Sequence, residues 1–586
     1  MTSPADSPKI DYTAHPADFF FVPGVDSGLA LLRPVSKLWR PVPRGRISAF
    51  AISAYDTHNT RLAPVINDAV RTRAFSHAVE VASAPVLLSD VSIQKNMIAV
   101  GGKWLLSGAA GTRVRNRHWK HQDLPPEQID TAIDAAFRAL QSSDGPMQPI
   151  EILSKPADRN LPYVIEARNL FNYYHFLIET LPRLEHCVEI GHKGPIHIVF
   201  HSDKISGFVL SFIRTLYPEL ADRVSLVPSP AQYDLVYSDF CFDHYYFMSP
   251  ERLMPSVRDL MQEKIRGEDR QTFRHSKRMF DANGYHACLA KLRKRALRAI
   301  KGQDFGHLPK RFWVSRDPAS PRARPMKNED LLLEQLIPMG FEVIRFETYS
   351  PLEQIALMAN AEVMASHHGA GFANMLFAGP NTHVVEIGHA QTAVARWRDF
   401  FPLAHVSGCH YVSFFADHNW ETPELEPEYE QDGLVAVAIS RNGIRSVARF
   451  LSALLGQTPR NSPLGEVQRA ADMLAQSGSW KQLGRFLERF DPLVATSADL
   501  MLLYARVKEA EQNPEATFHA LSLTLQLDQT RFGVLEWMVW LTRRIDRPDL
   551  ADTLMETHAE LFPERHQAFR QRLKWYQPGA ASLRGQ

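Results

Sequence analysis

The sequence predicts an α/β protein in which two sheet-forming halves are preceded by a β-rich region and followed by helices. Short apolar runs alternate with helical patterns over residues 161–242 and again over 311–389, and this alternation is typical of βαβ units and parallel sheets. From Gly465 onwards nearly all of the pattern is helical. Because 586 residues exceed what one hydrophobic core organises, we expect separate domains at 1–145, 146–305, 306–457 and 458–586.

Composition excludes several classes of protein. Hydrophobic residues make up 45% of the chain, as in ordinary globular proteins. The net charge of +1 gives no strong field toward nucleic acid, so we expect no nucleic-acid partner. Four cysteines without a CxxC spacing indicate a reducing compartment and no disulfide framework.

The N-terminus and the length of the apolar runs bear on location. Residues 1–20 lack a basic start and a long apolar core, so they do not resemble a signal peptide. No run approaches the ~18 apolar residues that a transmembrane helix needs. We therefore expect no transmembrane segment and a cytoplasmic location, with peripheral docking at the inner face of the membrane as the alternative.

The region before the first half holds short β-like runs separated by turn residues. These runs are Ile47–Ala54, Val86–Leu88, Ile98–Val100 and Trp104–Leu106. We expect them to form an irregular entry region that packs against the first half. The charged stretch Arg113–His121 is interpreted as a solvated loop face, and contact with a polyanion is the alternative.

The first half contains two apolar runs on either side of a long helical pattern. Pro162–Ala167 and Ile196–His201 are predicted strands, and Asn172–Ile190 between them is predicted as one helix. A basic helical pattern over Arg252–Lys301 is expected to connect the two halves.

A polar stripe follows the predicted helix Asn172–Ile190. At 100° per residue, Asn172, His175, Glu179 and Arg183 fall on one side, which we expect to face solvent or a cleft. Glu179 lies one turn from both His175 and Arg183, and a carboxylate that orients a histidine supports a role as general base. Pro182 should bend this helix. An ordinary charged surface with a modest ion pair is the alternative.

The second half holds the most informative stretch, Arg311–His389. A buried strand, Val363–Ser366, runs into His367-His368-Gly369-Ala370-Gly371 and then into a helical pattern that contains Asn374. Ligands of open α/β sheets bind beyond the carboxyl ends of strands, and a helix start there offers N–H groups to an anion. Two glycines would let the backbone approach a phosphate, and relief of packing at a tight turn is the alternative.

These motifs resemble glycosyltransferase family 61. His368-Gly369-Ala370, followed by Asn374, Phe377 and Glu386, is similar to the family's HGA-x-x-x-N-x-x-F segment and V-V-E-I strand. Asn172–Leu184 resembles its N-Y-x-H-x-x-x-E-x-L-x-R helix. Ser315-Arg316 and Arg324–Glu329 resemble its S-R strand end and its R-x-x-x-N-E helix start. The resemblance extends over residues 80–420.

The resemblance implies two Rossmann-like halves of GT-B type and an inverting enzyme that uses nucleotide sugars. The acceptor would be a glycan or glycolipid of surface polysaccharide or glycoconjugate biosynthesis. The expected base is His175, with Glu179 as the second candidate. The residues implied in donor binding are Arg316, His368, Gly369, Ala370, Gly371, Asn374 and Glu386. The residues implied in support of the site are Asn172, Arg183, Arg324 and Asn328.

We expect transfer without a metal and without a cofactor. The chain has no Asp-x-Asp motif, and His367 and His368 should point to opposite faces of their strand, into the core and into the cleft respectively. Arg316 and the helix start would supply the positive charge instead, and pairing of Arg316 with a local acid is the alternative. Glu386 is expected either to accept hydrogen bonds from a ribose or to be buried and paired within the protein.

The helical tail suggests an array of repeats. Ser497–Leu527 and Phe532–Phe562 each have the pattern of a helix–turn–helix, offset by about one tetratricopeptide (TPR) period of ~34 residues. A TPR-like array would bind a protein partner, and a helical cap over a domain edge is the alternative. Two other functions stay open: a non-catalytic scaffold on a degenerate fold that acts through this tail, and a different sugar-nucleotide enzyme such as an epimerase.

Overall fold

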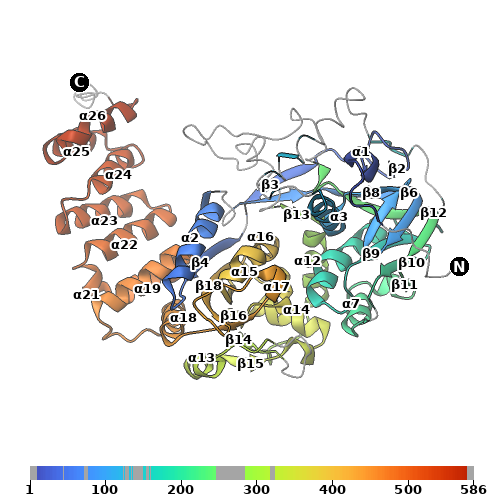
Figure 1. Cartoon of the computed structure of the whole chain (residues 1–586). Coiled ribbons are helices and arrows are strands. Elements are labelled where there is room, and N and C mark those ends of the chain that lie inside the picture. Colours follow the sequence, from blue (N-terminus) through green and yellow to red (C-terminus); the bar gives the residue numbers. More distant parts are fainter. Residues whose placement is uncertain are drawn as a thin grey trace. The chain divides into compact units, whose positions relative to one another are not determined.

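The computed structural model describes residues 10–43, 45–71, 77–122, 150–153, 160–202, 204–245, 284–316 and 324–576, with isolated positions between 125 and 158. Contacts divide the chain into two compact units, whose elements are labelled in Figure 1. One unit holds Met1–Glu329 and Gly340–Ser440, and the other holds Asp330–Met339 and Arg441–Gln586. The first unit contains all strands of the described residues, and the second is helical there.

The first half of the chain is built on a mixed sheet. Its parallel part runs in the order β12 (Ala231–Cys241), β9 (Tyr163–Ala167), β10 (Ile196–Phe200) and β11 (Val224–Pro228). An antiparallel part continues from β12 through β6 (Ser83–Gln94), β7 (Met97–Val100) and β8 (Lys103–Leu105), with β1 (Phe20–Phe21) and β2 (Leu29–Leu31) at its margins. All five residues of β9 are buried, as in parallel strands that are covered on both faces.

The second half is built on a sheet that is parallel except for one strand. It runs in the order β15 (Glu342–Ile344), β14 (Arg311–Val314), β16 (Val363–His367), β17 (His383–His389), β18 (His410–Asn419) and β4 (Arg46–Ala51). β19 (Ala436–Ala438) pairs antiparallel with β18. Every residue of β16 and β17 is buried. The predicted α/β architecture of two Rossmann-like halves is therefore confirmed.

The β-rich region at the start of the chain contributes strands to three sheets. β6, β7 and β8 extend the sheet of the first half, and β4 joins that of the second. β3 (Trp39–Pro43) and β5 (His77–Val81) form a small sheet with β13 (Gly284–His286). The physical reason is that a sheet edge leaves backbone groups unpaired, and these strands pair them.

The loop predicted over Arg113–His121 is wrong. Those residues belong to α3 (Gly108–Lys120), whose Val114 and Trp119 are buried against the first sheet's core. The apolar residues of the stretch recur at helical spacing, which its high charge obscured. Of the basic helix predicted over Arg252–Lys301, residues 252–283 lie outside the described residues, and α12 (Ala287–Ala299) is helical.

Helices of the first unit connect and cover these strands. In chain order they are α1 (Pro16–Phe19), α2 (Asp56–Arg71), α3, α5 (Tyr173–His175), η2 (Phe176–Thr180), η3 (Leu181–Arg183), α6 (Leu184–Glu189), α7 (Phe208–Leu216), α8 (Pro218–Ala221), α12, η6 (Phe346–Thr348), α14 (Pro351–Asn360), η7 (Ala370–Phe377), α15 (Ala390–Ala395), η8 (Trp397–Phe400), α16 (Phe401–Ser407) and α17 (Tyr429–Asp432). α14 begins with a capping box between Ser350 and Glu353, which satisfies two backbone N–H groups at its start.

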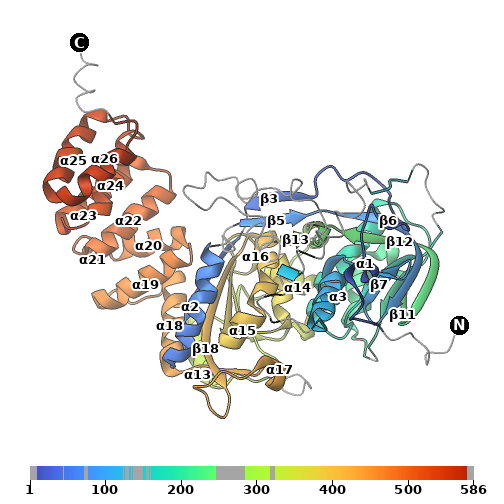
Figure 2. The same ribbon diagram turned by 45° about the horizontal axis from the view of Figure 1, so that its top comes forward.

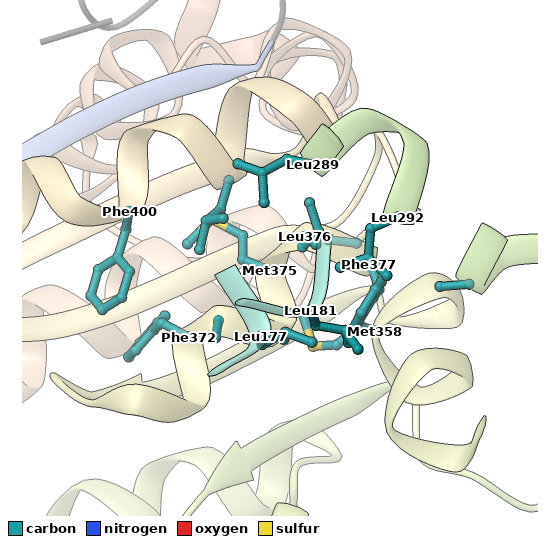
Figure 3. Close-up of a cluster of buried hydrophobic side chains, with 14 of the residues drawn as sticks. Leu177, Leu181, Leu289, Leu292, Met358, Phe372, Met375, Leu376, Phe377 and Phe400 are labelled. Carbon is teal, nitrogen blue, oxygen red and sulfur yellow. The ribbon is translucent and has the colours of Figure 1, made fainter. Parts of the chain in front are cut away.

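A single apolar cluster holds the helix that follows β16. Figure 3 shows Phe372, Met375, Leu376 and Phe377 of η7 beside residues of four other elements. Those residues are Leu177 of η2, Leu181 of η3, Leu289 and Leu292 of α12, and Met358 of α14. Because both halves contribute to this core, the turn at the end of β16 is fixed relative to the η2–η3 segment.

Helical hairpins repeat through the second unit (Figure 2). Within the described residues they are α19 (Leu464–Gln476) with α20 (Trp480–Arg489), α22 (Ala498–Ala510) with α23 (Pro514–Leu527), and α24 (Phe532–Thr542) with α25 (Pro548–Leu561). The first helices begin at 464, 498 and 532, and the second at 480, 514 and 548, so both series have a period of 34 residues. The two hairpins that the sequence predicted are present, and a third precedes them.

The remaining elements of the second unit flank this array. They are α13 (Glu329–Leu336), η5 (Ile337–Met339), α18 (Arg441–Leu454), α21 (Asp491–Val494) and α26 (Pro563–Arg572). α18 packs on α19 and α20 through buried residues such as Val447 and Phe450, so the predicted boundary at 457–458 lies inside this unit.

The chain's four cysteines are all free and buried. Among the helices of the described residues, none is both long and apolar enough to cross a membrane.

Candidate functional site

A cavity of about 900 Å³ opens between the carboxyl ends of β9, β14 and β16. Arg168 and residues 171–175 line it from the first half, and residues 314–316 and 366–372 line it from the second. Its position agrees with the rule that open α/β sheets bind ligands beyond the carboxyl ends of their strands. Aromatic rings of Phe346, Tyr349 and Phe400 complete the wall.

The segment that carries the first set of predicted residues is not one regular helix. Three residues of α5 lead into a π-helical turn, η2, and then into the 3₁₀ turn η3 before α6 begins. The cause is Pro182, which has no N–H to donate and cannot continue an α-helical ladder. In response, the Leu181 N–H bonds to the Phe176 carbonyl five residues earlier. Single π turns of this kind are frequent at functional sites.

His175 and Glu179 form a hydrogen-bonded pair at the edge of the cavity. The distance from His175 Nδ1 to Glu179 Oε1 is 2.7 Å. Arg113 Nη1 donates to the other oxygen, Glu179 Oε2, at 2.9 Å. Burial raises the pKa of Glu179, but the hydrogen bond and charge of His175 and the charge of Arg113 together hold it below its ordinary value. Glu179 is therefore a carboxylate at neutral pH, so His175 Nδ1 carries the proton.

Arg183 does not belong to the polar stripe that was predicted. Its side chain is buried, where Nε donates to Asp239 Oδ1 at 2.7 Å and Nη1 lies 2.6 Å from Glu166 Oε1. The π and 3₁₀ turns change the rotation per residue, so the 100° spacing fails after Glu179. Glu179 consequently pairs with Arg113 of α3 rather than with Arg183.

Two tyrosines of the same segment reach the second half. Tyr173 Oη donates to Asn374 Oδ1 at 2.6 Å, and Tyr174 Oη donates to the Asp399 carbonyl at 2.7 Å. Asn374 is fully buried and holds Tyr173, so it supports the wall of the cavity from behind. Asn172 caps α5, where its side chain accepts from the His175 N–H at 3.4 Å.

The second wall presents a second histidine–glutamate pair. His368 Nδ1 lies 2.6 Å from Glu386 Oε1. Glu386 is the fourth residue of β17 rather than its last, it is buried, and its Oε2 accepts from Tyr411 Oη and from Ser413 Oγ. Of the two predicted alternatives for Glu386, the buried carboxylate paired within the protein is the one observed. His367 is buried but also lines the cavity, so the prediction that it lies in the core and away from the cavity is wrong, and burial lowers its pKa to about 3.

Gly369 packs against Arg316, and this contact explains why the position is a glycine. A Cβ at Gly369 would collide with the Arg316 guanidinium, with Cζ at 2.7 Å. The φ angle of Gly369 is 176°, an extended conformation that any residue adopts, so a need for positive φ is not the reason. A Cβ at Gly371 would meet Phe346 at 3.4 Å, an ordinary contact.

Arg316 follows β14 and reaches the turn after β16. Its Nη2 donates to the His368 carbonyl, and the rest of the guanidinium lines the cavity. Burial, followed by the nearby charge of Arg324, lowers the pKa of Arg316 to about 10, so it stays charged at neutral pH. η7, which begins at Ala370, is a 3₁₀ helix rather than an α-helix, and its first N–H groups face no intrahelical acceptor.

The other two predicted supporting residues differ in position. Arg324 lines the cavity beside Arg316. Asn328 does not line it: its Nδ2 donates to the Ile439 carbonyl at 2.8 Å, and its φ of 67° is one that asparagine tolerates better than most residues. Asn328 thus stabilises the local backbone through this hydrogen bond and does not contribute to the cavity wall.

Sequence reasoning missed four charged residues of the cavity, Arg168, Glu347, Arg396 and Asp399. Arg168 directly follows the predicted strand Pro162–Ala167, and that position was a usable signal. Arg396 and Asp399 sit on short turns with no periodic pattern, so nothing in the sequence pointed to them.

In the part of the chain that the structure describes, no three His, Cys, Asp or Glu side chains converge as metal ligands would.

A known family is similar to the part of the chain that carries residues of both walls. Residues 173–385 match the family model described as Glycosyltransferase 61. These residues belong to glycosyltransferase family 61. The matched segment runs from Tyr173, beside His175, to Val385, beside Glu386, so it contains the facing His175 and His368. It is narrower than the resemblance over 80–420, and it supports a glycosyltransferase.

Comparisons with whole proteins add little to the family assignment. A search of curated proteins finds no match. Two solved structures, described as "Crystal structure of MamA" and "Crystal structure of MamA protein", are similar to 21% and 22% of this chain and to 68% and 74% of their own chains. Their identities are 16% and 14%, and the TM-score is 0.18 for each, so these likenesses carry no argument about fold or function.

Proposed function

We propose that the protein is an inverting, metal-independent glycosyltransferase that moves a sugar from a nucleotide-sugar donor to a hydroxyl of a glycan acceptor. His175 takes the proton of that hydroxyl while its oxygen attacks the anomeric carbon. The bond from the anomeric carbon to the diphosphate breaks, and the nucleoside diphosphate leaves with the electron pair. Arg316 and the first N–H groups of η7 stabilise its charge. No further cofactor takes part.

The observation that carries this proposal is that one cavity bears a carboxylate-held histidine on one wall and an arginine with a helix start on the other. In the neutral imidazole that a base requires, Glu179 holds the proton at Nδ1, so the opposite nitrogen, Nε2, has a lone pair for the acceptor proton. A base placed in this way contributes about 10²–10⁴-fold to the rate. His175 is favoured over Glu179, since both Glu179 oxygens already accept hydrogen bonds.

Two features of the second wall favour donor binding, its positive charge and the lack of bulky side chains at the turn after β16. Arg316 and Arg324 supply two cations, and a guanidinium can hold a phosphate through two parallel hydrogen bonds. Gly369, Ala370 and Gly371 leave the backbone accessible at the mouth of the cavity. His368, oriented by Glu386, lines the same cavity as this anion site and the base.

The wider setting is part of the same proposal. The two halves follow the GT-B plan, and the acceptor belongs to surface polysaccharide or glycoconjugate biosynthesis at the cytoplasmic face of the membrane. The 34-residue period of the hairpins supports a TPR-like array that binds a protein partner.

The experiment is a donor screen on the full chain, with nucleoside diphosphate sugars that differ in base and in sugar. Release of nucleoside diphosphate is followed by chromatography, and the anomeric configuration of the product by NMR. Release from one donor, with inverted configuration in the product, is the expected result. A retained configuration contradicts the single-displacement mechanism. Binding without release or chemical change supports the scaffold alternative, and a changed sugar still attached to its nucleotide supports the epimerase alternative.

A further inference from the structure

Arg168 is a cation of the cavity for which the described part of the chain provides no hydrogen-bond or ion-pair partner. It follows β9 directly, lines the cavity beside Tyr174 and His175, and is half-buried. It makes no hydrogen bond or ion pair with any residue that the structure describes. Burial lowers the pKa of Arg168, as it does for a charge removed from water without full compensation. An arginine kept in that state indicates a binding partner that arrives from outside the chain.

The nearest carboxylate cannot serve as that partner. Glu179 attracts Arg168, but its two oxygens are occupied by His175 at 2.7 Å and by Arg113 at 2.9 Å. Arg113 and Arg396 both repel Arg168, so positive charge accumulates on this side of the cavity. Asp399 is exposed and lies 3.8 Å from Arg396, which gives only a loose ion pair.

These cations form a group apart from the one at the turn after β16. Arg168 follows β9 and Arg396 follows α15, whereas Arg316 follows β14 and is held by the His368 carbonyl at the turn after β16. Tyr174, which lines the cavity with Arg168, donates to the Asp399 carbonyl at 2.7 Å, and the Asp399 carboxylate lies 3.8 Å from Arg396, so these residues form one patch. Neither Arg168 nor Arg396 falls within the family match of 173–385, so the patch is a feature of this chain beyond the matched segment.

We propose that Arg168 and Arg396 form a second anion site, beside His175, which binds a carboxylate group of the acceptor. The acceptor is then an acidic glycan, and its charged group holds the neighbouring hydroxyl at His175. The assignment of this anion to the acceptor rests on the function proposed above. The existence of two anion sites in one cavity does not.

The experiment titrates the full chain with two probes. Inorganic pyrophosphate fills the Arg316 site first, and glucuronate is then titrated at saturating pyrophosphate by ligand-observed NMR, with glucose as the neutral control. We expect glucuronate to bind the pyrophosphate-loaded protein and glucose not to bind. Arg168→Gln should weaken glucuronate by about tenfold, the scale of one charge-assisted hydrogen bond, and leave pyrophosphate affinity unchanged. Arg316→Gln should weaken pyrophosphate binding and leave the affinity for glucuronate unchanged.

Each other outcome overturns the proposal in a recognisable way. Competition between pyrophosphate and glucuronate means one site. Loss of pyrophosphate affinity in Arg168→Gln means that Arg168 belongs to the donor phosphate site. Absence of glucuronate binding removes the second site, while pyrophosphate binding at Arg316 leaves the proposed function standing. Arg396→Gln repeats the test if Arg168→Gln does not fold.

Discussion

Substitution of Gly369 by alanine tests how the second wall of the cavity is built. The new Cβ would occupy the space of the Arg316 guanidinium, so the arginine must swing away. Backbone strain is absent because the φ of 176° suits alanine. A hydrogen bond to a charged group contributes about 1.5–3 kcal/mol, so its loss should weaken nucleoside diphosphate binding about 10- to 100-fold. The melting temperature should stay within a few degrees of wild type.

The matched control is Gly371→Ala, two residues along the same turn. Its Cβ would meet only Phe346, at 3.4 Å, so nucleotide affinity should change little. Both variants and the wild type are titrated with nucleoside diphosphate by calorimetry, and unfolding is followed by circular dichroism. Equal affinities for Gly369→Ala and Gly371→Ala would refute the role of Arg316. Unfolding of Gly369→Ala would mean that this glycine serves the fold.

Three further predictions concern the metal, the buried ion pairs and acid. Nucleoside diphosphate should raise the melting temperature equally with and without EDTA, since arginine rather than a metal meets the phosphate; loss of the shift on chelation would contradict this. Arg183→Ala should lower stability by about 3–5 kcal/mol in urea unfolding because Glu166 and Asp239 lose their buried partner, and a wild-type midpoint would contradict that. His367 and His418 are buried with pKa values of about 3, so below pH 6.5 the unfolded chain binds protons that the folded chain does not, and stability should fall by about 1.4 kcal/mol for each at pH 5.5. His367→Leu should remove its share of that loss, and an unchanged pH dependence would contradict the assignment.

The strands and their order along the chain could be predicted because parallel strands are buried on both faces. Val363–Ser366 is a continuous apolar run with histidines and glycines behind it, and β16 occupies it with one residue more. The end of such a strand is a fixed place in the fold, so His368, Gly369 and Arg316 could be assigned to the cavity in advance.

The arrangement of the η2–η3 segment could not be predicted from helical spacing. A proline within a helical pattern permits a kink, a break or a change of pitch, and the choice depends on packing. The π turn kept His175 and Glu179 together and rotated Arg183 into the core beside Glu166. The second partner of Glu179, Arg113, comes from 66 residues earlier in the chain, and spacing carries no signal for such a contact.

Contacts between charged residues that lie far apart in the sequence could not be predicted either, because spacing carries no signal for them. Arg168 and Arg396 meet only because both halves close one cavity. The sequence analysis explained Gly369 by the conformational freedom of glycine. The structure shows instead that a Cβ there would collide with Arg316, 53 residues earlier in the chain, and local sequence rules do not describe such a contact.

The central claim is that His175 is the base and that the donor binds on the other wall. The measurement is turnover and nucleoside diphosphate affinity for His175→Ala and Glu179→Gln, with the exposed His307→Ala as a control. The account predicts that His175→Ala loses transfer by at least about 10²-fold while its nucleotide affinity stays at wild type, the pattern of an interaction made in the transition state. Glu179→Gln should reduce turnover less than His175→Ala, because Glu179 orients His175 and does not itself take the acceptor proton. Wild-type turnover in His175→Ala, or a loss of nucleotide affinity equal to the loss of rate, would contradict the claim.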